Sequence, residues 1–426
     1  MAPRLPRCHP PRLSLRRRLL RGAAIAAVST VIIAGAGSYV AYSQLDGNIS
    51  VLDTGAALGS DRPAAFTPPA SAPDDGGNSG AGTSSAALPT AQGAPAGNRS
   101  EEVAEAAPLN ILLIGSDTRR GAGNSDVGGE TPGLSDTTIV LHLSADRSRA
   151  YAVSIPRDSM VQRPTCLTED GQVTDPGGLS MFNAAYAVGG PACTQRTIEQ
   201  LTGIRIDHFA VIDFSGFRDM VDALGGVPIC VPKTVDDPVS GIHLEAGSYE
   251  VGGQQALDYV RIRHVISGNG DIGRMRRQQA FLASMVRTAV SRDMLTDPVG
   301  LYRFLDEATQ SLTTDPGLGD LPSLLNLARQ VQHIGLDRVQ FLTVPFESYV
   351  PNPNRLQWSR AAEDLWAQLR TDQPLTPEQA ETVLSAAPSQ GTATRSVPPE
   401  PPSAPTEPPV DAAEQAAADT NGLCSA

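Results

Sequence analysis

The sequence predicts an α/β fold with a mixed sheet, and three observations lead to this expectation. Short apolar runs alternate with segments whose apolar residues recur at helical spacing, which is typical of layered α/β domains. The loop over residues 145–148 is short enough to predict an antiparallel hairpin, so the sheet contains both strand directions. Pro, Ala and Ser are more frequent outside residues 108–372, which leaves about 265 residues for one large core.

The first part of this domain reads as three strands. Ile111–Ile114 is an apolar run followed by Gly, as in a strand that is buried on both faces, and two further strands follow within residues 134–158. Closing the hairpin brings Asp136 beside Arg157. A first strand antiparallel to the second would bring Asp117 to the same edge. The alternative is three unrelated polar residues at strand ends, where polar side chains are common.

The next part alternates helices with strands. Ile198 and Leu201 have helical spacing before a stop at Gly203. The elements expected after this helix are a strand over 206–214, a helix over 215–226 and a strand over 227–231.

A basic stretch from Asp258 to Gln279 is the strongest candidate for a binding site. We expect a strand over 258–265, then a Gly-Asn-Gly turn. Alternation along that strand would place Arg261 and Arg263 on one face. A guanidinium stays charged at any working pH and presents a fork of donors that matches phosphate oxygens.

The helix that opens near Asp271 adds to this candidate site. Arg274 and Gln278 stand four residues apart and therefore share a helix face, with Asp271 one turn earlier. The combined pattern indicates an anion clamp. The alternative is a solvated basic helix with a surface salt bridge, which contributes little to stability.

The N-terminus predicts a membrane anchor. Residues 1–21 hold seven arginines and no acidic residue, and residues 22–42 carry no charge. That length suffices for one transmembrane helix, with Tyr39 and Tyr42 at its outer interface and the arginines keeping the N-terminus cytoplasmic. Everything after residue 42 would then face the exterior. A cleaved signal peptide is the alternative.

Two segments predict disorder. Residues 43–107 are rich in Ala, Gly, Pro, Ser and Asp, and residues 373–426 repeat this composition with a Pro-rich middle. Such segments bury too little apolar surface to offset their ordering entropy. We expect a flexible linker and a mostly disordered tail.

The cysteines favour one disulfide. None of the five has a zinc-like C-x-x-C spacing, and an oxidising exterior favours pairing. Cys166 and Cys193 flank one loop, and a bridge between them would stabilise the fold by about 3–4 kcal/mol in the chain-entropy model. Cys230 is either a buried thiol or the true partner of Cys193. Cys424 and the cytoplasmic Cys8 are weaker candidates.

A resemblance to a known family extends these expectations. The motifs that carry it are N-I-L-L-I-G-S-D-T-R, S-D-T-T-I-V, S-I-P-R-D-S, F-N-A-A-Y, V-D-A-L-G-G-V, Y-V-R-I-R-H and D-I-G-R-M-R-R-Q-Q, in this order within residues 108–295. Together they resemble the LytR–CpsA–Psr family of cell-envelope proteins. The resemblance implies a three-layer α/β/α fold with an apolar lipid-binding tunnel, over residues 108–372. It also implies transfer of a glycopolymer from a polyprenyl-pyrophosphate carrier to peptidoglycan, usually with Mg²⁺.

The resemblance assigns roles residue by residue. Asp117 and Asp136 match the family's metal-associated aspartates, and Asp271 matches the acidic residue that positions the arginine cluster. The expected pyrophosphate contacts are Arg119, Arg157, Arg261, Arg263, Arg274 and Gln278. The residues expected to be catalytic are Arg157, Arg261, Arg263 and Asp271. The sequence departs from many relatives at Leu134 and Val211, where those carry basic residues, and this leaves the acceptor side less defined.

Two other functions remain as alternatives. One is an envelope-related transcriptional regulator, against which the net charge of −13, the anchor and the lack of a helix-turn-helix pattern all count. We therefore expect no nucleic-acid partner. The other is a non-catalytic module that binds wall polymer or lipid.

Overall fold

The structure is a computed structural model that describes residues 37–66, 107–117, 133–168, 171–174, 176–231, 234–237, 241–262, 271–291, 294, 296–380 and 383–385. Its helices are residues 37–48, α2 (Gly55–Leu58), α3 (Ala184–Thr202), α4 (Phe214–Ala223), α5 (Gly253–Arg261), α6 (Asp271–Ala289), α8 (Pro298–Ser311), α9 (Leu321–Ile334), α10 (Arg360–Arg370) and α11 (Pro377–Ala380). Its strands are β1 (Ser50–Val51), β2 (Leu109–Ser116), β3 (Ser135–Leu143), β4 (Ala150–Ser154), β5 (Met160–Arg163), β6 (Gly178–Met181), β7 (His208–Asp213), β8 (Val227–Val231), β9 (Val235–Asp237), β10 (Ile242–Leu244), β11 (Gly247–Val251), β12 (Leu312–Thr314), β13 (Val339–Thr343), β14 (Phe346–Ser348), β15 (Leu356–Trp358) and β16 (Leu384–Ser385).

The central sheet is mixed, as the sequence predicted. Eight strands follow the order β1-β12-β7-β2-β3-β4-β13-β16. β3 and β4 form the expected antiparallel hairpin, β2 pairs antiparallel with β3, and β7 runs parallel to β2. The C-terminal ends of β2, β4 and β7 and the N-terminal end of β3 therefore lie side by side at one end of the sheet.

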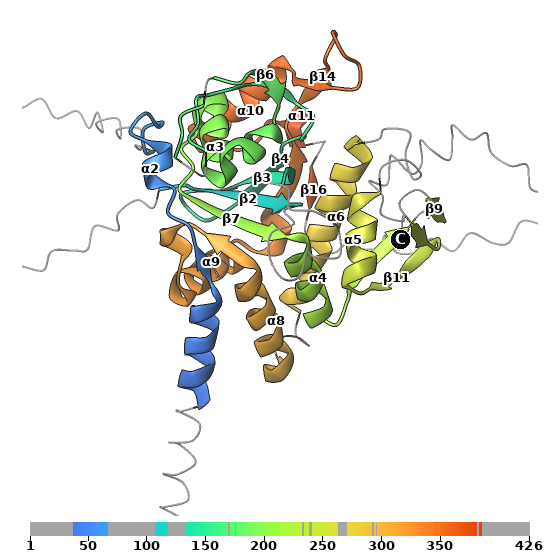
Figure 1. Ribbon diagram of the computed structural model, residues 1–426. Coiled ribbons are helices and arrows are strands. Elements are labelled where there is room, and N and C mark those ends of the chain that lie inside the picture. The colour runs from blue at the N-terminus through green and yellow to red at the C-terminus, as the bar shows by residue number, and fades with distance from the viewer. Residues whose placement is uncertain are drawn as a thin grey trace, which may run out of the picture.

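Helices cover both faces of this sheet and produce three layers (Figure 1). On one face, Leu112 and Val140 pack with side chains of α3 and α10, including the fully buried Trp366. On the other face, Ile139 packs with side chains of α6 and α9 such as Ile334. A separate apolar cluster joins α4, α5 and α6 to the strands β8–β11.

The strand expected over 258–265 is wrong, because residues 253–261 form the helix α5. Ala256, Leu257 and Tyr259 are at most 5% exposed, and Ala256 and Tyr259 pack into the cluster of α4 and α6, whereas Arg261 is exposed. Asp222 accepts a hydrogen bond from the first helical N–H of α5, which fixes where the helix begins. The burial of apolar side chains along a helix before Arg261 thus outweighed the alternation of polar and apolar residues that predicted a strand. The predicted turn after this segment lies outside the described residues.

The predicted linker is wrong for its first part, because residues 43–66 are ordered against the domain. Leu45, Ile49 and Leu58 are buried, and β1 pairs in parallel with β12 at the sheet edge. Asn48 donates to Asp306 of α8, with a nitrogen-to-oxygen distance of 2.8 Å, and Arg62 pairs with Glu199 of α3. A few buried anchors and backbone pairing suffice to order a segment whose composition predicts a coil.

The predicted tail also begins later than expected. Residues 373–380 and 383–385 are described, and β16 pairs with β13 as an edge strand of the sheet. Leu375 and Val383 pack against the core on the face covered by α10. The remaining residues of the tail and residues 67–106 of the linker lie outside the described part of the chain.

The predicted anchor falls mostly outside the described residues. Of residues 22–42, only 37–42 are described, and they form the start of a helix that projects from the domain (Figure 1). Tyr39 is 72% exposed. Within the described ranges, no helix combines the length and the apolar composition needed to cross a membrane.

Candidate active site

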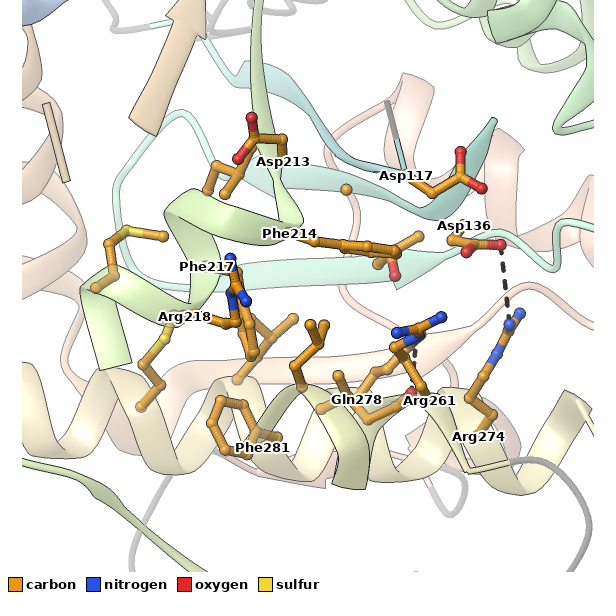
Figure 2. A pocket seen from close by; sticks show the side chains of 18 of the residues that line it. Asp117, Asp136, Asp213, Phe214, Phe217, Arg218, Arg261, Arg274, Gln278 and Phe281 are labelled. Carbon is orange, nitrogen blue, oxygen red and sulfur yellow. Dashed lines mark hydrogen bonds and ion pairs between the residues drawn. The ribbon is translucent and has the colours of Figure 1, made fainter. Parts of the chain in front are cut away.

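A large cavity lies between the sheet and the helices α4, α5 and α6 (Figure 2). Its volume is about 1040 Å³. More than half of its lining residues are apolar, from Leu113, Ile114, Ile139, Ala210 and Ile212 of the sheet to Phe214, Phe217, Met220, Leu257, Val260, Phe281, Leu282 and Met285 of the helices. Figure 2 shows Asp117, Asp136, Arg261 and Arg274 at one end and the rings of Phe217 and Phe281 towards the other, where Asp213 and Arg218 also lie. The cavity therefore has a mainly apolar lining and a cluster of two arginines and two carboxylates at one end, which we call its mouth.

Two carboxylates at the mouth come from neighbouring strands. Asp117 follows β2 and Asp136 lies in β3, and both line the cavity. The pairing of β2 with β3 shifts register between Gly115 and Ser116. Beyond this shift the pairing continues, because the Asp117 N–H donates to the carbonyl oxygen of Leu134. The Asp117 carboxylate in turn accepts from the Leu134 N–H at 2.5 Å. Strand pairing thus holds both carboxylates at the end of the sheet where the predicted hairpin opens.

Two arginines approach Asp136 from different elements. Arg157, in the loop after β4, places Nη1 2.7 Å from Asp136 Oδ1. Arg274 of α6 places Nη1 3.9 Å from the same oxygen, and this arginine is only 2% exposed. A buried guanidinium is rarely tolerated unless it is paired and hydrogen-bonded. The site therefore concentrates fixed positive charge around one carboxylate.

Arg261 and Gln278 complete the described part of the mouth. Arg261 ends α5, and its Cζ lies 5.2 Å from the ring centroid of Phe214, a cation–π contact that orients an otherwise exposed side chain. Gln278 Nε2 donates to the carbonyl oxygen of Val260 at 3.3 Å and so ties α6 to α5. Arg261 joins the cluster from a helix end, although the sequence placed it on a strand.

Three predicted residues cannot be placed in this cluster. Arg119 and Arg263 lie outside the described residues. Asp271 is the first residue of α6, one turn before Arg274, but its side chain is outside the described part of the structure. Their assigned roles stay predictions.

Arg277, which connects α6 to the residue after α5, was not identified from the sequence. It is 2% exposed, and its Nη2 donates to the carbonyl oxygen of Ile262 just after α5. Burial lowers the pKa of Arg277 to about 10, so the group remains charged at neutral pH. Tyr259 is buried nearby, and burial raises the pKa of its hydroxyl to about 12. The signal was its three-residue spacing from Arg274, which puts both arginines on one helix face.

The carboxylates suit a hard cation. In the described part of the chain, no three His, Cys, Asp or Glu side chains cluster as a complete metal site. Mg²⁺, however, commonly uses one or two protein carboxylates and completes its shell with substrate phosphates and water. Asp117 and Asp136 on the rim of one cavity fit that pattern.

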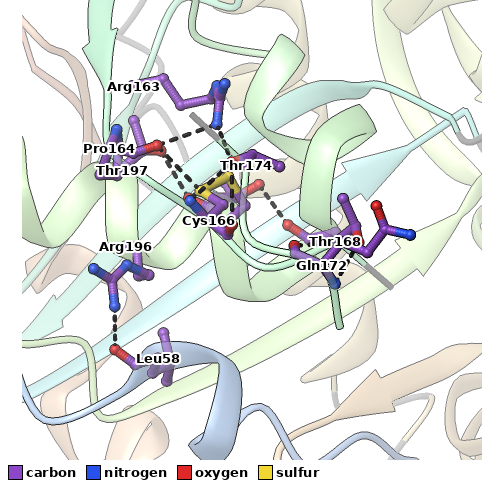
Figure 3. Close-up of a disulfide and its surroundings, with 12 residues drawn as sticks. Leu58, Arg163, Pro164, Cys166, Thr168, Gln172, Thr174, Arg196 and Thr197 are labelled. Atoms are coloured by element: carbon purple, nitrogen blue, oxygen red, sulfur yellow. Dashed lines mark hydrogen bonds between the residues drawn. A yellow bond between two sulfur atoms is a disulfide. The ribbon is translucent and has the colours of Figure 1, made fainter. Parts of the chain in front are cut away.

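A disulfide fixes the loop that follows β5. Cys166 and Cys193 of α3 are bonded, with a Cα–Cα distance of 5.3 Å, which is the predicted pairing (Figure 3). The Cys166 N–H donates to Thr174 Oγ1 at 3.0 Å, and Arg163 Nη1 donates to the same oxygen at 3.1 Å. Cys230 is also disulfide-bonded, so it is neither a free thiol nor the partner of Cys193.

Comparison with known proteins identifies one family. The family model described as the LytR_cpsA_psr family matches residues 81–371. A probable cell wall biosynthesis protein LcpB of Corynebacterium glutamicum is 36% identical over 222 residues, which cover 51% of this chain and 50% of that protein. A polyisoprenyl-teichoic acid–peptidoglycan teichoic acid transferase TagU of Bacillus anthracis is 31% identical over 199 residues, 47% of this chain and 58% of that protein. The chain thus spans about half the length of the curated relatives it matches.

A solved structure supports the fold. The crystal structure of protein gbs0355 from Streptococcus agalactiae superposes with a TM-score of 0.52 at 20% identity, and covers 64% of this chain and 90% of that one. At this level of identity the likeness concerns the fold.

Proposed function

The chain belongs to the LytR_cpsA_psr family, and from its site we propose that it is a membrane-anchored phosphotransferase. It moves a glycopolymer from a polyprenyl-pyrophosphate carrier to peptidoglycan during cell-wall assembly. The observation that carries this proposal is one cavity whose lining is mainly apolar and whose mouth has arginines and carboxylates. A polyprenyl pyrophosphate has the same division between a long apolar tail and a compact anion.

The interior of the cavity suits the tail. Its volume of about 1040 Å³ lies at the upper end for small-molecule sites, which run from about 300 to 1,000 Å³. Burial of a hydrocarbon chain against Phe217, Phe281 and Met285 would contribute about 25 cal/mol per Å² of apolar surface removed from water. Apolar burial would therefore supply affinity without selecting the sugar.

The mouth suits the pyrophosphate. Arg157, Arg261 and Arg274 would bind its non-bridging oxygens with guanidinium forks, and Gln278 would supply a neutral donor. Phosphoryl transfer needs neutralised oxygen charge and aligned reactants more than covalent help from the protein. These fixed side chains provide both.

The reaction that we propose is a displacement at the phosphorus attached to the glycan. An acceptor hydroxyl of peptidoglycan forms the new phosphorus–oxygen bond, and the bond from this phosphorus to the bridging oxygen breaks. Polyprenyl phosphate leaves with that oxygen, and the hydroxyl proton passes to a base, a role that we propose for Asp117 or Asp136. The same carboxylates are the residues that would hold Mg²⁺, whose charge would stabilise the phosphate oxygens when it is bound.

The location that we propose follows from the arginine-rich segment 1–21 and the uncharged segment 22–42. The N-terminus would be cytoplasmic and the domain extracytoplasmic, where its carrier lipid and peptidoglycan are both accessible. The disulfide between Cys166 and Cys193 is consistent with an oxidising exterior.

Glycan transfer by the full chain in detergent tests the proposal. Polyprenyl-pyrophosphate-linked glycan and peptidoglycan are mixed with the wild type or with the Arg261→Ala, Arg263→Ala double variant, and glycan on peptidoglycan is measured by mass spectrometry. We expect transfer by the wild type and a loss of at least 100-fold in the double variant. Arg338→Ala is the matched control, because Arg338 is 60% exposed and remote from the cavity lining. Carrier binding without transfer in the wild type would instead favour a non-catalytic lipid-binding module.

A further inference from the structure

Arg157 has a second carboxylate neighbour besides Asp136. Its Nε lies 3.5 Å from Asp158 Oδ2. The other oxygen of Asp158, Oδ1, lies 2.9 Å from Nη1 of Arg355. Four side chains of alternating charge thus form a row, in the order Asp136, Arg157, Asp158 and Arg355. The first three have side chains no more than 16% exposed, and Arg355 is 34% exposed.

Arg355 belongs to a hairpin that is docked onto the loop of Arg157. β14 and β15 form this hairpin, and Arg355 immediately precedes β15. The Leu356 N–H donates to the carbonyl oxygen of Asp158 at 3.2 Å, and Leu356 forms a parallel bridge with Ser159. At the other side of the hairpin loop, the Tyr349 N–H donates to the carbonyl oxygen of Arg355 at 2.9 Å. Backbone bonds on both sides therefore fix where Arg355 enters the row.

The charge of the row depends on Arg355. With it, two carboxylates and two guanidinium groups sum to zero; without it, the row carries one net negative charge beside the place where an anion would bind. Within the described residues Asp158 would then pair with Arg157 alone, and its attraction would draw that guanidinium away from Asp136, which lines the cavity. Between charges about 10 Å apart near a protein surface and partly screened by salt, this difference corresponds to about a threefold to tenfold change in affinity for a phosphate.

We propose that Arg355 is a positioning residue for phosphoryl transfer. It holds and neutralises Asp158, so that Arg157 keeps its orientation and its charge for the pyrophosphate. This inference rests on the proposed function for its reaction, but it makes a prediction about anion binding alone. Arg355 also connects the β14–β15 hairpin to the site, 197 residues from Asp158 along the chain.

Binding of two probes by the full chain tests this role. Farnesyl pyrophosphate carries an apolar tail and the anion, and farnesol carries the tail alone. Arg355→Met removes the charge and keeps most of the side-chain volume, Arg355→Lys keeps the charge, and Arg338→Met is the exposed control. We expect Arg355→Met to weaken farnesyl pyrophosphate about threefold to tenfold, with farnesol affinity unchanged and Arg355→Lys within about twofold of the wild type.

The pathway of the effect is tested in a double-mutant cycle. If Arg355 acts in part through Arg157, then Arg355→Met should have a clearly smaller effect in an Arg157→Met background, where only the loss of the Arg355 charge itself remains. Additive losses would overturn the proposal, and so would unchanged affinity or an equal loss for farnesol. If Arg355→Met does not fold, Arg355→Gln takes its place beside Arg355→Lys, with the same expectations.

The outcome is separable from that of the transferase proposal. Should the wild type fail to transfer glycan while farnesyl pyrophosphate affinity responds to Arg355 as expected, the proposed reaction falls and the positioning role stands. Should transfer occur while the Arg355 variants bind farnesyl pyrophosphate as the wild type does, the positioning role falls and the proposed reaction stands.

Discussion

The two ends of the central sheet both carry clusters of charged side chains, and one of these clusters borders the cavity described above. At the end already described, Asp117, Asp136 and Arg274 line the cavity mouth. At the opposite end, His142 is fully buried between Asn110 and Asp372, with distances of 2.8 Å and 3.2 Å to their oxygens. The same residue types can therefore bind a ligand or stabilise the fold.

Carboxylates at both ends are paired, for Asp136 contacts Arg157, so the neighbouring cavity is what separates the two cases. Besides His142, Asp372 also meets Arg149 Nη2 at 2.8 Å and accepts the Ala145 N–H at 2.9 Å. Burial alone would raise the pKa of Asp372, but the hydrogen bonds from His142 and Ala145 outweigh it and lower that pKa. The carboxylate is thus satisfied by the protein itself. At the cavity mouth, by contrast, the arginines and carboxylates border a space large enough for a ligand.

The largest expected effect is on activity, through the carboxylates at the cavity. Asp117→Asn and Asp136→Asn retain the side-chain shape but remove the charge that would hold a cation or accept a proton. We expect the double variant to lose about 10²–10³-fold in transfer rate, and a chelator to have a similar effect on the wild type. The rate of glycan transfer with and without added Mg²⁺ measures both. Full activity in chelator would rule out the metal role.

The next effect is on stability, at the opposite end. Asp372 has a φ of 52°, a backbone conformation that Asn also tolerates, so Asp372→Asn removes the charge without adding strain. We expect the free energy of unfolding to fall by about 2 kcal/mol, because Arg149 and His142 lose a charged acceptor. Thermal denaturation should show a decrease in Tm of about 4–8 °C. The farnesyl pyrophosphate affinity should stay within twofold of the wild type, and a large loss there would contradict the division between the two ends.

The smallest effect is a pH dependence of stability, also at that end. His208 Nδ1 lies 3.0 Å from Asp315 Oδ1. This hydrogen bond raises the pKa of His208 against the effect of burial. Burial opposes ionisation of Asp315, but the hydrogen bonds from His208 and from the Phe209 N–H outweigh it and lower the pKa of Asp315.

The signs of these shifts define a window. The contribution of His208 is fully present below its unfolded pKa of 6.5 and is lost as the pH rises through its higher folded value. That of Asp315 is present above its unfolded pKa of 3.8 and is lost as the pH falls through its lower folded value. We expect stability from this pair to be greatest between about pH 4 and 6.5, by about 1 kcal/mol. Urea denaturation across this range should show the maximum in the wild type, and the same dependence in Asp315→Asn would assign it to other groups.

The sequence was sufficient for the strand-derived half of the site. A short loop at 145–148 dictates an antiparallel hairpin, and the hairpin places Asp136 beside Arg157 by geometry alone. Asp117 follows for the same reason, since β2 pairs antiparallel with β3. Local chain geometry decides such contacts, and it is visible in the order and length of the segments.

Tertiary structure decided the half of the site that lies on helices and the distant segments that pack around the site. Residues 253–261 form a helix because their apolar side chains pack against α4 and α6. The pattern of these nine residues alone does not reveal that packing. Residues 43–66 are ordered because β12 and α8 supply partners from about 260 residues further along the chain. The contact of Arg355 with Asp158 likewise spans 197 residues. Side-chain periodicity reports the neighbours of a residue within its own element, whereas burial and pairing depend on which distant elements pack against it.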